Sequence, residues 1–169
     1  MQSATFPIIE TLRTYLRPLS SEDVSGLYEI YSDAEAMKFR ANPPLKSKEE
    51  ALEMVEKAKR NFQENHSLRW GVVEKNSDKL LGTFVWTKEK TKTGLVGYSL
   101  GKSCWGKGFM SEVMERMVDY LLNEEGLNTL AAWVHPSNVA SVRLLKKYDF
   151  QIVSQEVEPD LYYMRLVNR

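Results

Sequence analysis

The centre of the chain carries the sequence GYSLGKSCWGKGFMSE, residues 97–112, which predicts a strand, a glycine-bearing turn and the start of a helix. Gly106 and Gly108 lie two residues apart where the strand gives way to the helix. Glycine lets a backbone approach a ligand closely or adopt a positive φ. A helix start also presents unpaired N–H groups and the positive end of a dipole, which suit a phosphate. We therefore predict that this turn holds a phosphate-bearing cofactor.

The helix that follows this turn is strongly amphipathic. Its apolar side chains recur at the positions i, i+3, i+4, i+7 and i+8, namely Met110, Val113, Met114, Met117, Val118, Leu121 and Leu122. This spacing is typical of a helix with one buried face. Gly126 fits the residue that ends such a helix, because its backbone tolerates the left-handed conformation found there.

Length and composition narrow the class of protein. A chain of 169 residues suits one domain spanning residues 1–169. Lys and Arg together number 23, as do Asp and Glu, and this zero net charge argues against a general nucleic-acid binder. The apolar runs are too short for a membrane span, and residues 1–7 lack the pattern of a signal peptide. The single cysteine excludes an internal disulfide and fits a reducing, cytoplasmic setting.

The first part of the chain predicts a strand followed by two helices. Residues 8–18 predict the strand, and Ser20 or Ser21 is a suitable N-cap for the first helix. Asn42-Pro43-Pro44 cannot continue a helix and marks a loop. Arg40 in the same loop hints at a lid.

The second helix and the strands after it follow from similar signals. Ser47-Lys48-Glu49-Glu50 fits a capping box, which predicts a helix reaching about residue 65. Three strands joined by polar turns are expected over residues 68–74, 80–86 and 95–100. Short turns make these three strands antiparallel neighbours.

Beyond the central helix, residues 130–134 predict a buried strand. Ser137 or Asn138 caps a short helix. Two late strands are expected over residues 150–157 and 161–167, separated by Glu158-Pro159-Asp160. The predicted order is β-α-α-β-β-β-α-β-α-β-β, and the strand–helix–strand unit over residues 95–134 should be a right-handed parallel crossover. We predict an α/β fold with a mixed, mostly antiparallel central sheet and helices on both faces.

At this point the sequence resembles a GNAT-superfamily N-acetyltransferase, and more narrowly the RimJ/RimL-like branch that acetylates ribosomal-protein N-termini. The likeness covers nearly the whole chain, and its motifs are specific in combination because of their order and spacing. They are Thr14-Tyr15-Leu16-Arg17-Pro18-Leu19 followed by Asp23, then Leu81-Gly82-Thr83-Phe84, Gly97-Tyr98-Ser99-Leu100, Trp105-Gly106-Lys107-Gly108-Phe109-Met110-Ser111-Glu112 and Asn138-Val139-Ala140-Ser141-Val142-Arg143-Leu144-Leu145.

The resemblance implies acetyl-CoA as the acetyl donor, without a metal. In this superfamily the pyrophosphate binds backbone N–H groups of the glycine-bearing turn, and the pantetheine arm pairs with the strand before it. The strand over residues 130–134 is expected to splay away and leave a slot for the cofactor. The residues that the resemblance assigns to the cofactor are Tyr98, Ser99, Leu100, Ser103, Cys104, Trp105, Gly106, Lys107, Gly108, Phe109, Met110, Asn138 and Ser141.

The chain also departs from the superfamily pattern. Ser103 stands where Gln or Arg usually begins the turn, and Asp149 replaces a glycine that commonly ends the last helix. Leu145 stands where many members carry a tyrosine that protonates the CoA thiolate, and Tyr148 is out of register with that position. The RimL-like branch uses a serine in this helix, which matches Ser141. The resemblance therefore suggests Ser141 as the thiolate acid.

The chemistry needs few groups, and each candidate has a structural alternative. A base or a water relay must take a proton from the amine, and Glu112, Glu74, Glu89 and His135 are the side-chain candidates. Glu74 and Glu89 fit hairpin-surface charges better, and His135 fits a structural hydrogen-bond partner better. Glu112 is expected in a first helical turn simply because of the dipole. Cys104 fits small-residue packing better than a nucleophile, because no His is near it in the sequence. The cations that either bind CoA phosphates or form an ordinary surface are Lys102, Lys107, Arg143, Lys146 and Lys147.

Two functions remain open, with a third, weaker one behind them. The first is an N-acetyltransferase that moves an acetyl group to a primary amine, either a protein N-terminus or a small molecule, by direct attack in a ternary complex. The second is an inactive acyl-CoA-binding module, suggested by Leu145, and the third is an unrelated nucleotide-binding fold. The acceptor site should involve the first two helices, the loop over residues 39–45 and the hairpin over residues 157–161. GNAT proteins are often dimers, so a homodimer is compatible with the resemblance.

Overall fold

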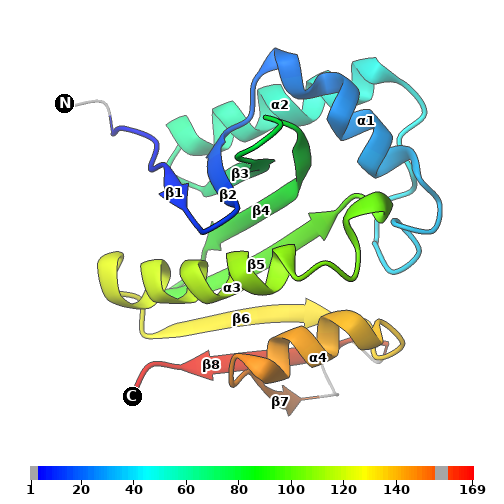
Figure 1. Cartoon of the computed structure of the whole chain (residues 1–169). Helices are drawn as coiled ribbons and strands as arrows, with labels where there is room; N and C mark the ends of the chain where they lie inside the picture. The colour runs from blue at the N-terminus through cyan, green and yellow to red at the C-terminus, as the bar shows by residue number, and fades with distance from the viewer. Residues whose placement is uncertain (1–3, 155–159) are drawn as a thin grey trace.

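The computed structural model describes residues 4–154 and 160–169, which form one eight-stranded sheet flanked by helices (Figure 1). The strands are β1 (Ile9–Glu10), β2 (Thr14–Pro18), β3 (Ser67–Glu74), β4 (Leu80–Lys88), β5 (Thr93–Leu100), β6 (Thr129–Val134), β7 (Gln151–Ser154) and β8 (Tyr162–Val167). The helices are α1 (Val24–Ser32), α2 (Lys48–Gln63), α3 (Phe109–Asp119) and α4 (Val139–Lys147). The predicted α/β fold and element order are confirmed, with one strand added.

The added strand arises because residues 8–18 do not form one continuous strand as predicted. The chain turns between β1 and β2, where the Thr11 amide donates to the Thr14 carbonyl at 2.9 Å. The two halves then pair antiparallel, with Ile9 opposite Leu16. A local turn held by threonines therefore replaces the extended backbone expected from the alternating pattern.

The sheet order is β1-β2-β3-β4-β5-β6-β8-β7. Every described pair is antiparallel except β5 with β6, which is the predicted parallel crossover through α3. The parallel pairing joins only Thr93 with Thr129, Gly94 with Leu130, and Leu95 with Ala131. Beyond these positions the described strands separate, so β5 has an open edge from Val96 to Leu100.

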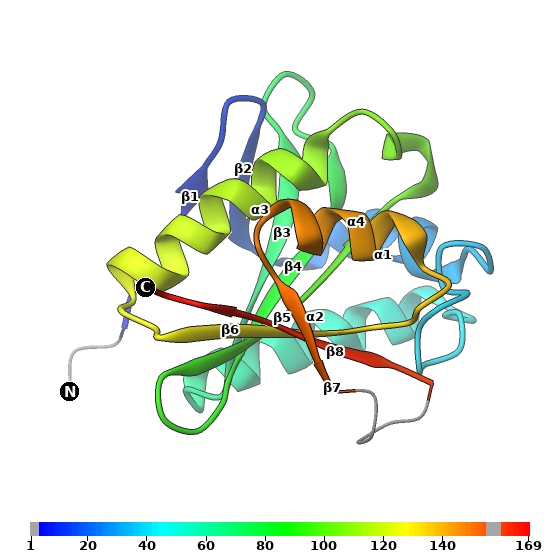
Figure 2. The ribbon, with the colours of Figure 1, turned by 90° about the horizontal axis from the view of Figure 1, so that it is seen from below.

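The helices cover both faces of the sheet (Figures 1 and 2). Helices α1 and α2 pack with Val73 and Leu80 in one cluster, and α3 and α4 contribute to the larger cluster on the other face. The side chains of Ser47 and Asn138 cap their helices as predicted, each accepting an amide at 3.3 Å, from Glu50 and Ser141 respectively. The capping box expected at Ser47 is only half formed, because the Glu50 carboxylate accepts from the Lys46 amide at 2.7 Å instead. Helix α3 continues into a π-helical turn over Tyr120–Glu124 before Gly126, whose φ is +69°.

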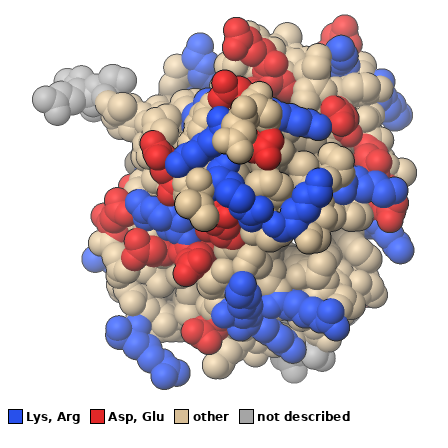
Figure 3. All heavy atoms as spheres, viewed as in Figure 1, with Lys and Arg blue, Asp and Glu red and all other residues tan. Residues whose placement is uncertain are grey.

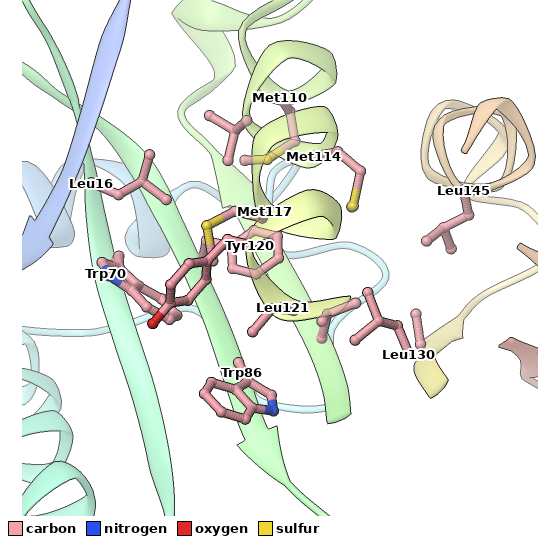
Figure 4. Packing of buried hydrophobic residues seen from close by; sticks show 14 of the residues in the cluster. Leu16, Trp70, Trp86, Met110, Met114, Met117, Tyr120, Leu121, Leu130 and Leu145 are labelled. Atoms are coloured by element: carbon pink, nitrogen blue, oxygen red, sulfur yellow. The ribbon is translucent and has the colours of Figure 1, made fainter. Parts of the chain in front are cut away.

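The larger core cluster joins α3 to the middle of the sheet (Figure 4). Met114 and Met117 on α3 and Leu121 on the π-helical turn after it are fully buried, as the helical spacing predicted. Leu145 points from α4 into the same cluster and is also fully buried. The core therefore fixes α3 and α4 against the sheet close to the place where β5 and β6 separate.

The end of the chain is only partly comparable with the prediction. Strands β7 and β8 pair antiparallel, which agrees with two late strands. Residues 155–159 lie outside the described residues, and they hold the end of the predicted strand over residues 150–157 and most of the hairpin over residues 157–161.

Candidate functional site

A cleft of about 550 Å³ opens where β5 and β6 separate, bounded by the start of α3, by α4 and by the segment between α1 and α2. The structure brings most of the residues assigned to the cofactor to this cleft: Tyr98, Ser99, Leu100, Cys104, Trp105, Gly106, Gly108, Phe109, Met110, Asn138 and Ser141 line it. Ser103 and Lys107 are not among the lining residues. Both are exposed.

The glycine-bearing turn has the backbone conformation that its sequence predicted. Gly106 and Gly108 have φ values of +73° and +79°, a region that side chains with a Cβ rarely adopt. A Cβ built on Gly106 would meet no atom within 4 Å, so the space beside this backbone is open. The amides at the start of α3 have no partner inside the helix. The turn therefore offers backbone donors to an anion in the cleft.

The outer side of this turn is held by Arg13. Its Nη1 donates to the Lys107 carbonyl at 3.0 Å, and its guanidinium lies 4.2 Å from the centre of the Phe109 ring. On the inner side, the Trp105 indole N–H donates to the Leu100 carbonyl at 3.0 Å. Cys104 is buried beside Leu81 and Phe109, which agrees with packing as its role. These contacts fix the turn before any ligand binds.

Two hydroxyl groups meet inside the cleft. The Tyr98 Oη and Ser141 Oγ atoms are 2.6 Å apart, which joins β5 to α4 across the open edge. Burial raises the pKa of Tyr98 to about 12, against the hydrogen bond from Ser141 and the charge of Arg40, which lower it. The phenol therefore keeps its proton at neutral pH, and the pair can donate a hydrogen bond to a third atom in the cleft.

The last helix does not present residue 145 to the cleft. Leu145 is fully buried in the core, and Leu144 lines the cleft instead. Tyr148 is tied elsewhere, since its hydroxyl donates to the Ser111 carbonyl at 2.7 Å. The phenol that meets Ser141 in the cleft comes from Tyr98 on β5. Tyr98 lies more than forty positions before Ser141, so the sequence of the last helix did not indicate it.

Only one of the four candidate bases reaches the cleft. Glu112 accepts from the Thr11 hydroxyl and the Arg13 amide, both at 2.6 Å, and ties α3 to the β1–β2 turn. Glu74 accepts from Ser77 at 2.5 Å in the β3–β4 turn, and Glu89 lies in the β4–β5 hairpin. His135 lines the cleft.

The hydrogen bonding of His135 limits what it can do. Its Nδ1 accepts from the Ser137 amide at 3.1 Å, so the neutral ring carries its proton on Nε2. The ring also stacks on Phe39, with the ring centres 5.2 Å apart. His135 in this state can donate a hydrogen bond but has no free lone pair for an amine proton.

The basic residues fall into two groups. Lys102 forms an ion pair with Glu35, and the Lys147 ammonium donates to Ser111 Oγ at 2.6 Å. Arg143 and Lys146 are exposed on α4, and Figure 3 shows Lys and Arg side chains gathered over this helix. The surface beside the cleft is therefore positive, which agrees both with binding of CoA phosphates and with an ordinary charged surface.

The segment between α1 and α2 extends across the cleft to contact β5, which its sequence did not indicate. Arg40 Nη2 donates to the Tyr98 carbonyl and to Ser99 Oγ on the open edge of β5. Tyr31 at the end of α1 also lines the cleft and shares a hydrogen bond with Thr83 Oγ1 at 2.6 Å. No local signal could have located these contacts, because each joins residues more than fifty positions apart.

The described residues show neither a membrane-spanning helix nor a metal-binding cluster. Within residues 4–154 and 160–169, none of the helices has the length and apolarity that crossing a bilayer requires. The same residues contain no group of three or more His, Cys, Asp or Glu side chains placed to hold a metal ion.

Comparison with known proteins places this architecture in a family. Residues 13–151 match the family model of the acetyltransferase (GNAT) domain. The chain is 32% identical over 148 residues to the uncharacterized N-acetyltransferase YoaA of Bacillus subtilis, covering 86% of this chain and 84% of that protein. These matches exclude an unrelated nucleotide-binding fold.

Solved structures share the fold at low sequence identity. RimL, a ribosomal L7/L12 α-N-protein acetyltransferase in complex with coenzyme A, superimposes with a TM-score of 0.83 at 16% identity, covering 95% of this chain and 98% of that one. Spermidine N-acetyltransferase from Vibrio cholerae, in complex with CoA and spermine, gives a TM-score of 0.80 at 19% identity, with coverage of 92% and 95%. Since the family model spans most of the chain, this protein belongs to the GNAT family and is an N-acetyltransferase.

Proposed function

We propose that this protein transfers an acetyl group from acetyl-CoA to a primary amine by direct attack in a ternary complex. The observation that carries the proposal is the cleft between β5 and β6, with the left-handed glycines Gly106 and Gly108 at its rim. RimL and the spermidine N-acetyltransferase of Vibrio cholerae are both described with CoA bound, which supports the same donor here.

The residues of the cleft suit a long ligand with a phosphate end. The amides of residues 106–109 would bind the pyrophosphate, which needs donors rather than a particular side chain. The amides of Cys104 and Trp105 instead donate to the Gly101 and Lys102 carbonyls and hold the turn. The open edge of β5 from Tyr98 to Leu100 would pair with the amides of the pantetheine arm, which would share the Tyr98 carbonyl with Arg40 and the Leu100 carbonyl with the Trp105 indole. Arg143 and Lys146 on α4 are exposed nearby and would attract the remaining phosphate.

The acyl transfer then needs three things from the chain. The amine nitrogen attacks the thioester carbon, and a backbone N–H of β5 would stabilise the oxyanion. When the carbon–sulfur bond breaks, the Ser141 hydroxyl gives its proton to the departing thiolate and takes one back from water, while the Tyr98 hydroxyl donates a hydrogen bond to Ser141 Oγ. The proton lost from the amine passes to water, since neither Glu112 nor neutral His135 is placed to take it.

The test is release of free CoA from acetyl-CoA, followed with a thiol-detecting reagent across a panel of primary amines that includes peptide N-termini and polyamines. The proposal requires CoA release with at least one amine and saturable binding of acetyl-CoA. Binding of CoA without release for any acceptor would instead support an inactive acyl-CoA-binding module. The absence of CoA binding would refute both.

A further inference from the structure

The acceptor side of the cleft carries a guanidinium whose charge is not neutralised. Arg40 lines the cleft, is exposed, and donates to the Tyr98 carbonyl and Ser99 Oγ. Both acceptors are uncharged. Among the described residues, Arg40 forms no ion pair with a carboxylate. Its positive charge therefore remains available to a ligand.

A second guanidinium lies at the Thr83 hydroxyl, which the Tyr31 hydroxyl also contacts. Arg69 on β3 is half-buried, and its Nη1 donates to Thr83 Oγ1 at 3.3 Å. It too forms no ion pair within the described part of the chain. Removing a cation from water without a counter-ion costs free energy. An anionic ligand would offset this cost.

The charges of Arg40 and Arg69 both act on the Tyr31 hydroxyl. Burial alone would raise the pKa of Tyr31, but the charges of Arg69 and Arg40, with hydrogen bonds from Ser99 and Thr83, lower it. A lowered phenol pKa means that negative charge is favoured at that point. Tyr31 lines the cleft, so this positive potential reaches the space open to an acceptor.

The acidic residue at this end does not cancel the potential. Glu35 lines the cleft rim but is paired with Lys102. His135, which also lines the cleft, is stacked on Phe39 and accepts a backbone amide. Within the described residues, the lining therefore has an unpaired cation and no unpaired carboxylate.

We propose that the acceptor is a primary amine that carries a carboxylate, which Arg40 binds while Arg69 adds its charge from beside Tyr31. A guanidinium fork matches the geometry of a carboxylate and gives a strong, charge-assisted pair. A polyamine would instead bring further positive charge to these arginines and be repelled. The inference rests on the proposed acetyl transfer and goes beyond it by naming the acceptor class.

The experiment compares carboxylates with their amides, which have nearly the same shape. One arm uses β-alanine and β-alaninamide, and a second uses short peptides that differ only in an N-terminal Asp or Asn, so the arms separate free acids from acidic N-termini. Rates are expressed per neutral amine, because the amide changes the amine pKa. We expect kcat/KM to favour the carboxylate by about tenfold or more in at least one arm, with spermidine a poorer acceptor than either.

Variants test whether the arginines cause this preference. Arg40→Gln should reduce the preference to below about threefold, Arg69→Gln should reduce it partly, and Arg40→Lys should keep part of it. Arg60→Gln is the matched control, because Arg60 is an exposed arginine on α2 that does not line the cleft. It should keep the full preference.

The outcomes separate this inference from the proposed function. Turnover with equal rates for carboxylates and amides, or with spermidine preferred, would overturn the inference and leave the acetyl transfer standing. If no amine is acetylated, calorimetric titration of the Asp and Asn peptides into the CoA-bound protein makes the same comparison without turnover. Tighter binding of the Asp peptide, lost in Arg40→Gln, supports the inference there, whereas equal or absent binding contradicts it.

Discussion

A valine at Gly106 tests the glycine-bearing turn most directly. The residue has a φ of +73°, and a Cβ at this position would meet no protein atom within 4 Å. The cost to the folded state is therefore confined to backbone strain, about 1–2 kcal/mol. For a chain of this size that corresponds to a fall in Tm of about 2–8 °C. The protein should stay folded while the valine side chain occupies the space beside the backbone donors.

The loss of ligand binding should be much larger than the loss of stability. A hydrogen bond to a charged group contributes about 1.5–3 kcal/mol, so losing one or two donors to the pyrophosphate raises the Kd for CoA about 100-fold. Isothermal titration calorimetry measures this Kd, and differential scanning calorimetry measures the Tm.

Gly126→Val is the matched control for this prediction. Gly126 has a φ of +69°, and a Cβ there also meets nothing within 4 Å, but the residue lies after α3 and away from the cleft. It should lower the Tm by a similar amount and leave the Kd for CoA unchanged. If Gly106→Val binds CoA within about threefold of the wild-type Kd, or Gly126→Val weakens CoA equally, the assignment of the turn is refuted.

The remaining predictions concern the hydroxyl pair, the α3 anchor and the last helix. Ser141→Ala and Tyr98→Phe should each lower kcat by about 10- to 100-fold with little change in the Kd for CoA, as steady-state kinetics will show. Because the raised pKa of Tyr98 keeps its phenol protonated, the loss in Tyr98→Phe should be equal at about pH 7 and about pH 9; a loss confined to one pH would contradict the role. Burial opposes ionisation of Glu112, but hydrogen bonds from Thr11 and Arg13 and the charge of Arg13 lower its pKa in the folded state. A lowered folded-state pKa stabilises the protein above the unfolded pKa of about 4.3, and the gain is lost as the pH falls through the folded value. Glu112→Gln should therefore lower the free energy of unfolding by about 1–2 kcal/mol at neutral pH, and urea titrations should show the gap closing in acid; a gap that is constant with pH would argue against the ionised carboxylate. Leu145→Tyr should not improve catalysis, because it overpacks a fully buried site and should lower stability by about 1–3 kcal/mol in the same titrations; a rise in kcat without loss of stability would refute this placement.

The donor end of the site could be predicted from sequence because its signals are local. The two glycines mark the left-handed turn, the spacing of Met110, Met114 and Met117 marks the buried face of α3, and Asn138 caps α4. Each of these features depends on residues within a few positions of one another. The predicted order of elements and the parallel crossover followed from the same local patterns.

The rest depended on contacts between distant parts of the chain. Nothing near Arg40 indicates that it reaches the open edge of β5, and nothing near Tyr98 indicates that it meets Ser141. The orientation of α4 was equally hidden, since adjacent leucines could not show that Leu144 lines the cleft while Leu145 enters the core. Glu112 is a further example, because a first-turn acid suits the helix dipole whether or not it also binds Arg13. Only the packed structure decides between such alternatives.

The short parallel ladder between β5 and β6 also has a mechanical consequence. Three residue pairs hold the two halves of the sheet together, and α3 and its π-helical turn carry the chain across the gap. The backbone ladder at this join is short, so the amides along it should exchange hydrogen sooner than those of β3 and β4. A ligand that binds both sides of the join would hold the two halves of the sheet together. Release of the ligand would make both halves of the sheet more flexible, so hydrogen exchange would distinguish the ligand-bound protein from the free protein.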